Sequence, residues 1–343
     1  MTDIQKSKEL VRNLYDALAV AGSGEYESIL GQHMAADHRW RGVHPFDEQR
    51  GAEKVAQVFW EPLHAAFSSL QRREDIFMAG VNASDADGAT WVISMGKLLG
   101  LFDEDWLGIP ATGRMVFLPY VDFHRVAAGE IVETVGFCDV LSVMQQSGLH
   151  PLPQQTGATV LFPGPRTQDG LMVSARDPQQ GERTLALLNK MIADLLGDLV
   201  GASMSPSRAV LASTWCDDMC WFGPVGIGAT FTIDRYRQQH QGPFSAGLTD
   251  FGYKDHECLA AEGHFGALFA WTGFTMRSTG GFMGLPASDI LSTMRVADVY
   301  RRDGDKLAEN WVFIDVLHFL YQQGLDVLER CREINHHSTD GQV

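Results

Sequence analysis

The chain has 343 residues, of which 45% are hydrophobic and 20% are charged, and this balance excludes a disordered or fibrous protein. Its 27 Lys and Arg residues against 43 Asp and Glu residues give a formal net charge of −16, which argues against nucleic acid and anionic membrane surfaces as partners. The first residues lack the apolar core of a signal peptide, and no apolar run approaches the ~18 residues of a membrane-spanning helix. Because the five cysteines are scattered, we expect a cytoplasmic protein without a disulfide framework.

The first 150 residues change from a helical to a strand-like pattern along the chain. Apolar residues at helical spacing predict helices over residues 4–19 and 55–67. Residues 38–44 show no regular pattern, so we expect them to be irregular. The later segments are short, rich in β-branched or aromatic residues and separated by turns, and they predict strands near 73–81, 88–100, 114–126 and 130–139. Helices followed by a run of antiparallel strands indicate an α+β fold.

The second half of the chain repeats the first. Over residues 110–149, 12 of 40 residues recur 176 positions later without a gap. Among them, Asp122 recurs as Asp298, and Asp139 recurs as Asp315. A period of this length is too long for a solenoid and indicates that a whole domain was duplicated.

The second copy has its own run of predicted elements. It opens with a strongly apolar helix around residues 188–199, and strands are expected near 255–261, 265–277, 290–302 and 306–316. Five prolines between residues 151 and 178 indicate a stiff, extended linker between the copies. We therefore divide the chain into a first domain (1–150), a linker (151–180), a second domain (181–335) and a tail (336–343).

Several short motifs of the first copy occur together in one known family. They are, in chain order, His44-Pro45, Gly51-Ala52-Glu53, Pro62-Leu63, Gly108-Ile109-Pro110-Ala111-Thr112-Gly113-Arg114, Asp122-Phe123-His124-Arg125, Gly129-Glu130-Ile131-Val132-Glu133 and Gln145-Gln146-Ser147-Gly148-Leu149. On these motifs the first copy resembles the SnoaL-like polyketide cyclases of the NTF2-like superfamily. The second copy looks like the same family with motifs lost, since Gly223-Pro224 stands where His44-Pro45 is expected. The resemblance implies two tandem NTF2-like (cystatin-like) domains, each a bent antiparallel sheet wrapped by helices into a cone with an apolar pocket.

The resemblance also implies a function. It points to an acid–base catalyst that needs no cofactor and no metal, and that closes a ring of a polyketide ester by intramolecular aldol or isomerase chemistry. The substrate would be a hydrophobic carbonyl compound, and the proton-moving carboxylate would be Asp139, with Asp315 as its counterpart. Because this fold serves many chemistries, a non-catalytic small-molecule-binding protein and an epoxide hydrolase or dehydratase remain as alternatives.

Asp139 supports two interpretations. It follows an apolar strand, and a carboxylate that points into an apolar cavity has its pKa raised towards the range of a general base. It also precedes a short apolar run, so it could instead cap a helix. A catalytic Asp139 should lie near the floor of a dead-ended cavity, whereas a structural one should be bound by backbone N–H groups or by an arginine.

Histidines are the next candidates. His124 lies two residues after Asp122 on a predicted strand, so the two side chains face the same way. His124 could act as an acid partner in catalysis, or it could form a structural hydrogen bond with Asp122. His44 is a further catalytic candidate near the mouth of the cone. We expect the first copy to be the chemically competent one, because the second has Tyr300 in place of His124. The predicted pocket-lining residues are His38, Trp40, Trp60, Phe117, Asp122, Phe137, Trp221, Trp271, Trp311 and Phe313.

Three further patterns favour structural roles. Arg125 and Glu133 flank a tight turn and predict a cross-strand ion pair. The run Cys216–Cys220 lacks the ligand spacing of a zinc site, so we assign it to the core. The glycine-rich run 223–228 is not a nucleotide-binding motif, and we expect a bend that shapes the pocket entrance.

The faces of the two sheets outside the cones must be buried somewhere. We therefore expect the copies to pack through their sheets as an intrachain pseudo-dimer. A homodimer of the whole chain is a further expectation.

Overall fold

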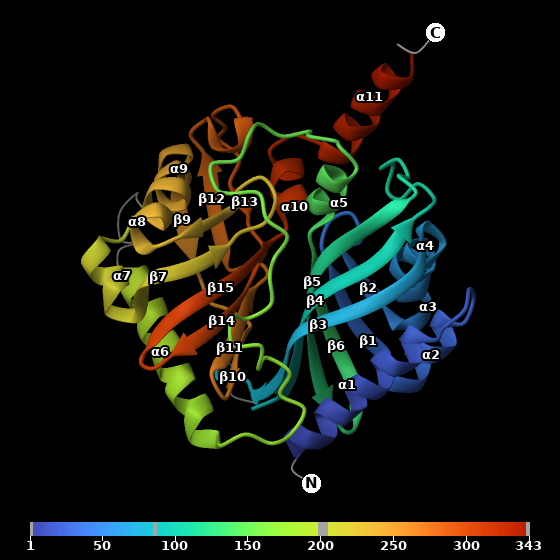
Figure 1. The fold of residues 1–343 in the computed structure, drawn as a ribbon, viewed down its shortest axis with the longest axis horizontal. Coiled ribbons are helices and arrows are strands. Elements are labelled where there is room, and N and C mark those ends of the chain that lie inside the picture. The colour runs from blue at the N-terminus through green and yellow to red at the C-terminus, as the bar shows by residue number, and fades with distance from the viewer. Residues whose placement is uncertain (1–2, 85–87, 198–204, 341–343) are drawn as a thin grey trace.

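The computed structural model describes residues 3–84, 88–197 and 205–340, and its two halves each combine a curved sheet with helices (Figure 1). The elements of the first half are α1 (Asp3–Ala19), α2 (Tyr26–His33), β1 (Met34–Gly42), β2 (Glu48–Arg50), α3 (Gly51–Val55), the π-helical turn η1 (Ala56–Trp60), α4 (Glu61–Ala66), β3 (Phe67–Val81), β4 (Thr90–Phe102), β5 (Arg114–Ala127), β6 (Glu130–Cys138) and α5 (Val140–Gln146). The six strands form one sheet in the order β2-β1-β6-β5-β4-β3. The two predicted helices and four predicted strands of this half are confirmed.

One prediction for the first half is wrong. Residues 34–42, of which 38–42 were expected to be irregular, form strand β1, which pairs in parallel with β6. Arg41 is buried in this strand, where it forms ion pairs of 2.8 Å to Glu133 and 2.5 Å to Glu257 of the second half. A charged residue at a buried position hides the alternation of apolar and polar residues that is typical of a strand. A charged residue that is neutralised by another part of the chain cannot be distinguished from an exposed one in the sequence.

The second half repeats this order with two sheets. Its elements are α6 (Pro178–Gly197), α7 (Arg208–Thr214), β7 (Trp215–Phe222), β8 (Ala229–Phe231), α8 (Ile233–Tyr236), the π-helical turn η2 (Arg237–Gln241), α9 (Gly242–Gly247), β9 (Leu248–Tyr253), β10 (Cys258–Glu262), β11 (Phe265–Ala270), β12 (Phe274–Ser278), η3 (Phe282–Gly284), β13 (Ser292–Thr293), β14 (Val296–Asp303), β15 (Lys306–Ile314), α10 (Val316–Gln322) and α11 (Val327–Asp340). The α+β class is confirmed. Strand β15 and helix α10 begin and end 176 residues after β6 and α5, so the repeat seen in the sequence is also a repeat of structure.

The second half differs where its strands are interrupted. Predicted strands 265–277 and 290–302 are each two strands, and their outer pieces form a separate sheet, β13-β12-β9. Gly273 stands at one interruption, where its carbonyl accepts a hydrogen bond of 2.7 Å from the Lys254 N–H, and a side chain there would collide with the Asp255 backbone. In the first half the equivalent strands β3 and β4 are continuous, and their pairing shows a register shift between Glu74 and Ile76 instead of an interruption.

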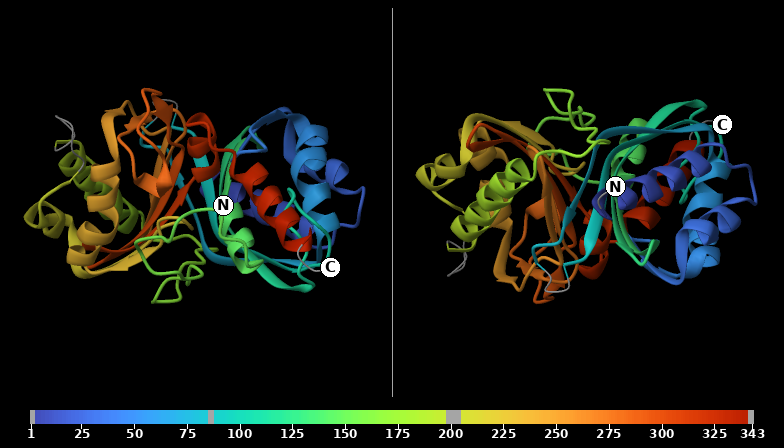
Figure 2. Two further views of the ribbon diagram at one scale, coloured as in Figure 1. Left: turned by 90° about the horizontal axis from the view of Figure 1, so that it is seen from above. Right: turned by 90° about the horizontal axis from the view of Figure 1, so that it is seen from below.

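The two halves contact each other through the outer faces of their six-stranded sheets, which is the packing predicted for the copies (Figure 2). Phe269 lies between Trp91 and Phe123, with ring centroids 5.4 and 5.0 Å away. Glu262 is the polar centre of this contact, because it accepts hydrogen bonds from the Lys8 ammonium at 2.5 Å and from the Ala79 N–H at 2.8 Å. Each half therefore shields the outer face of the other.

The linker has a packing role of its own. Between α5 and α6 it runs without helix or strand, and α6 begins at Pro178, slightly before the predicted boundary. The Trp311 indole donates a hydrogen bond of 2.8 Å to the Pro163 carbonyl, and the Phe162 ring lies 5.5 Å from that of Phe313. Trp311 and Phe313 were predicted to line a pocket; the structure instead places them on the outer face of the sheet, under the linker.

The C-terminal segment also differs from the prediction. Residues 336–340, expected as part of a tail, continue helix α11, which leads from the second half towards the first (Figure 2). Within the three described ranges, no helix is both long and apolar enough to cross a membrane.

Substitution of Lys8 tests the contact between the halves. Lys8→Met leaves the buried Glu262 carboxylate without its hydrogen-bonded cation, so we expect the free energy of unfolding to fall by about 3–5 kcal/mol in urea titrations. Lys6→Met, on the exposed side of the same helix, is the control and should change it by less than about 0.5 kcal/mol. Equal effects of the two substitutions would contradict a stabilising role for the Lys8–Glu262 pair.

Candidate functional site

The cone of the first half is almost filled by its own side chains. Its walls are mainly apolar and aromatic, with Trp40 from β1 and Trp60 from η1. The remaining space, about 30 Å³ for the centres of water-sized molecules, holds one or two waters and no larger ligand.

A closed polar cluster occupies the floor of this cone. The Tyr15 hydroxyl lies 2.8 Å from His124 Nε2 and donates to Asp122 at 3.3 Å. Arg72 donates to the same Asp122 oxygen at 3.0 Å and places its guanidinium 3.8 Å from the centre of the Tyr15 ring. His124 Nδ1 contacts the Thr134 hydroxyl at 2.9 Å. The carboxylate thus has a cation and a phenol as partners.

Burial governs the charges in this cluster. It raises the pKa of Asp122, an effect that the adjacent Arg72 opposes. It lowers the pKa of His124 well below its usual range, and the charge of Arg72 acts in the same direction. His124 is therefore neutral at neutral pH, and the floor of the first cone is a satisfied structural network with no free base.

Apart from Asp139, the predicted catalytic and pocket-lining residues of the first half divide into two groups. Trp40, Trp60, Asp122, His124 and Phe137 line the cone. The other three lie elsewhere. His38 is buried with Nδ1 2.9 Å from the Ile131 carbonyl, Phe117 binds Gln146 through its backbone, and His44 lies in the loop after β1.

The structure also corrects the expected position of Asp139. Its carboxylate caps α5 by accepting a hydrogen bond of 3.1 Å from the Ser142 N–H. Its other oxygen accepts from the Val225 N–H of the second half at 3.0 Å. Asp139 thus meets the criterion for a structural carboxylate bound by backbone N–H groups. Burial nevertheless raises its pKa to about 6, against the effect of these hydrogen bonds.

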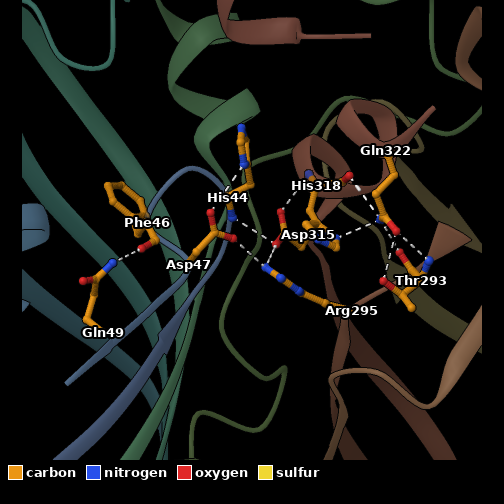
Figure 3. A network of polar contacts seen from close by, with 9 residues as sticks. All are labelled: His44, Phe46, Asp47, Gln49, Thr293, Arg295, Asp315, His318 and Gln322. Atoms are coloured by element: carbon orange, nitrogen blue, oxygen red, sulfur yellow. Dashed lines mark hydrogen bonds and ion pairs between the residues drawn. The ribbon is translucent and has the colours of Figure 1, made fainter. Parts of the chain in front are cut away.

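Asp315 makes the mirror-image contact (Figure 3). It caps α10 through the His318 N–H at 3.1 Å and accepts from the His44 N–H of the first half at 3.0 Å. Arg295 donates to it at 3.1 Å and also pairs with Asp47 at 3.2 Å. Asp315 and His44, both predicted to be catalytic, are therefore brought together, but at the contact between the halves. Trp271, a predicted pocket residue, also lies at this contact, 4.5 Å from the Arg295 guanidinium.

The second half holds a larger cavity. About 170 Å³ is open to the centres of water-sized molecules, enough for a small organic ligand, and most of the lining is apolar. Trp221 lines it as predicted. Asp298, the counterpart of Asp122, also lines it, and its carboxylate accepts a hydrogen bond of 3.1 Å from the Asn310 amide.

The carboxylate is retained between the copies while its partners change. Tyr300 stands where the first half has His124, and Asn310 stands where it has Thr134. Phe274 is the repeat equivalent of Leu98. Tyr253 pairs with Phe274, as Arg72 pairs with Leu98, so Tyr253 occupies the position of Arg72. The second copy therefore lacks the cation that neutralises Asp122.

The electrostatics of the second cavity follow from this loss. Burial raises the pKa of Asp298 to about 6, and hydrogen bonds from Asn310 and Tyr300 oppose the shift only in part. Burial also raises the pKa of Tyr236, and that of Tyr253, above the usual value. A carboxylate that loses its proton at about pH 6 thus shares an apolar cavity with three protonated phenols, since burial raises the pKa of Tyr300 as well.

Sequence reasoning did not include Asp298 among the candidate site residues. The available signal was the identity of Asp122 and Asp298 in the repeat combined with the change of every partner around them. Such a combination indicates a position whose carboxylate is kept while its chemistry changes.

The other sequence patterns have structural roles. Arg125 stands opposite Glu133 as predicted, but the ion pairs that Glu133 forms among the described residues are with two arginines of β1. The equivalent residues of the second half, Arg301 and Glu309, do form a cross-strand ion pair. In Cys216–Cys220 only Met219 is fully buried, so the assignment of this run to the core is wrong for its cysteines. Within the described part of the chain, no three His, Cys, Asp or Glu side chains form a group that could hold a metal ion.

Substitution of Asp315 tests the contact in Figure 3. Asp315→Ala removes a helix cap and leaves Arg295 and the His44 N–H without a buried acceptor, so we expect a loss of about 3–5 kcal/mol in the free energy of unfolding. Asp326→Ala is the matched control, because Asp326 caps α11 through the Glu329 N–H in an exposed position, and it should cost about 1 kcal/mol. If both variants lose the same stability in urea, Asp315 acts as a cap alone.

Comparisons with known proteins find one family model and a set of similar solved structures. A model of the SnoaL-like polyketide cyclase family matches residues 9–147, and no curated protein matches the chain. One similar solved structure is a protein of Jannaschia sp. CCS1 assigned as a SnoaL-like polyketide cyclase; it is 26% identical, covers 42% of this chain and 94% of its own, and has a TM-score of 0.34. IdmH from Streptomyces antibioticus, assigned as a polyketide cyclase, is 21% identical, with coverages of 42% and 99% and a TM-score of 0.34. AclR from Streptomyces galilaeus, assigned as a hydroxylase, is 19% identical, with coverages of 44% and 85% and a TM-score of 0.35. The first half of this chain is thus similar to the SnoaL-like polyketide cyclase family over residues 9–147, and the second half repeats the order of helices and strands of the first.

Proposed function

We propose that the cavity of the second half is a site of general acid–base catalysis on a hydrophobic carbonyl compound, with Asp298 as the base. The observation that carries this proposal is the Asp298 carboxylate itself, which is half-buried at the wall of an apolar cavity, has an amide and a phenol as partners, and has no cation beside it among the described residues of the lining. Desolvation makes such a carboxylate a stronger base than an exposed one.

The residues around Asp298 suit proton abstraction next to a carbonyl. Asp298 would take the proton from the carbon, and the electron pair of the C–H bond would move onto the carbonyl oxygen as an enolate. Tyr236 is suited to stabilise that oxygen, because burial keeps its hydroxyl protonated and Gln241 provides it with a hydrogen bond. Attack of the enolate carbon on a second carbonyl would form the new C–C bond of an aldol product, and the proton held by Asp298 would return to the alkoxide.

The first cone is less suited to this chemistry. Its Asp122 is paired with Arg72, and its free space is about 30 Å³ against about 170 Å³ in the second half. The expectation that the first copy is the competent one rests on His44, His124 and the motif Pro110–Arg114. Against it, His44 lies outside the cone and His124 is engaged by Tyr15 and Thr134.

Exchange of the α-protons of 2-tetralone for deuterium, followed by NMR, measures proton abstraction without knowledge of the natural substrate. We expect Asp298→Asn to slow the protein-catalysed exchange about 10²–10⁴-fold, because the amide keeps the shape but accepts no proton. Asp139→Asn is the control and should keep the rate within about threefold, because Asp139 does not line the cavity and the Asn oxygen still caps α5, although the hydrogen bond from the Val225 N–H is lost. Loss of exchange in Asp139→Asn alone would move the base to Asp139, and binding of 2-tetralone without exchange in the wild type would favour the binding-protein alternative.

The pH dependence provides a second check. A base acts in its ionised form, and the pKa of Asp298 is raised to about 6, so the exchange rate should rise with pH through about 6 and then level off. The pH profile of kcat/KM reports this ionisation in the free protein. A rate that is already constant at about pH 5 would show that the reacting base has an ordinary pKa.

A further inference from the structure

A second chamber adjoins the cavity of the second half. We call it the vestibule. Its space is about 290 Å³, and its walls are linker residues 153–156, residues 226–227, the segment 239–247 and the loop 280–284. His240 lines both the cavity and the vestibule, so the two chambers meet at its ring.

Aromatic rings separate the two chambers. The His240 ring stacks on Trp221 with centroids 4.0 Å apart and lies 5.6 Å from Phe244, which in turn lies 5.6 Å from Phe282. Phe244 faces the cavity and Phe282 faces the vestibule. The partition therefore consists of side chains, and rotation of a ring would join the chambers.

The vestibule exists because the open ends, or mouths, of the two cones are covered by different segments of the chain. Gly108 and Gly284 are equivalent in the repeat, with φ of +80° and +78°. A Cβ on Gly108 would lie 2.7 Å from Arg332 of α11, whereas a Cβ on Gly284 would lie 2.8 Å from Pro153 of the linker. Each mouth is thus covered by the segment that follows the last helix of the other half. In the first half the cover is a helix, and in the second it is an extended linker that leaves space beside it.

The chemistry of the vestibule differs from that of the cavity. Its lining includes no Asp, Glu, Lys or Arg, and its polar side chains are Gln154, Gln155, Thr156 and Gln239. Gln155 and Thr156 already form hydrogen bonds within the protein. The side-chain amides of Gln154 and Gln239 can recognise hydroxyl and amide groups by hydrogen bonds but offer no partner for a charge. His240 is neutral at physiological pH, because burial lowers its pKa to about 3.

We propose that the cavity and the vestibule bind one uncharged amphiphile, with its apolar body beside Asp298 and its hydroxyl- or amide-bearing end in the vestibule. The His240 ring lies where the two parts of such a ligand join, and no described residue hydrogen-bonds it, so its free nitrogen can bind a polar atom at the junction. The assignment rests on the proposed function in one respect, namely that the cavity is the ligand site.

Displacement of the neutral fluorophore N-phenyl-1-naphthylamine measures this binding. The competitors are n-octyl β-D-glucoside below its micellar concentration, 1-octanol and octanoate, which share an alkyl chain and differ in the polar end. We expect the glucoside to displace the fluorophore at about tenfold lower concentration than octanol, because its hydroxyl groups reach the vestibule, and octanoate to be the weakest of the three. Equal potency of glucoside and octanol, or a preference for octanoate, would overturn the inference.

Filling the vestibule provides the matched variant. Ala246 lines it on α9, and Ala65 is its exposed equivalent on α4 of the first half. Ala246→Phe should reduce the advantage of glucoside over octanol to about onefold, while Ala65→Phe should retain it. Retention of the full advantage in Ala246→Phe would overturn the inference. If the fluorophore does not bind the wild-type protein at all, the cavity proposal itself fails; if it binds and only the glucoside advantage is missing, the vestibule alone is wrong.

Discussion

The reciprocal contact between helix caps and loops fixes the relation of the two halves. Asp139 caps α5 and holds the Val225 N–H, while Asp315 caps α10 and holds the His44 N–H. Each carboxylate has two oxygens, so one can satisfy its own helix and the other the opposite half. Once both oxygens are used in this way, the carboxylate cannot also face the interior of its cone. The position to which the family resemblance assigns proton transfer is therefore occupied by a structural contact in both copies.

The chemistry that remains in the cones depends on what surrounds the retained carboxylate. In the first half Arg72 neutralises Asp122 and fills the floor together with Tyr15. In the second half the equivalent positions are phenols and an amide, so the carboxylate of Asp298 keeps its desolvation penalty and its basicity. A buried charge without a cation is costly for stability, and its retention beside an open cavity is typical of a functional group.

The sequence was sufficient for the fold and for part of the site. Segments rich in β-branched and aromatic residues, separated by turns, identified the long strands, and the repeat located the second domain. The residue pattern of a strand does not show which of its faces lines the cone when both faces are buried. Trp311, which the linker covers on the outer face, was therefore assigned to a pocket. The pattern fails also for β1, where Arg41 is buried against glutamates of both halves. Asp122 and His124 were correctly placed together on one face, because that inference needs only the geometry of one strand.

Covalent fusion permits an asymmetry that a symmetric pair of identical domains does not. In a two-fold homodimer both mouths have the same cover, because both chains end in the same way. In this chain the segment after α5 must continue to α6 and stays extended, whereas the segment after α10 is free to form helix α11. The cover of the second mouth, including Pro153 on Gly284, is thus set by the need to connect the halves. The linker is therefore both the connection between the domains and a wall of the chamber beside the only one of the two cones that has room for a ligand in the described structure.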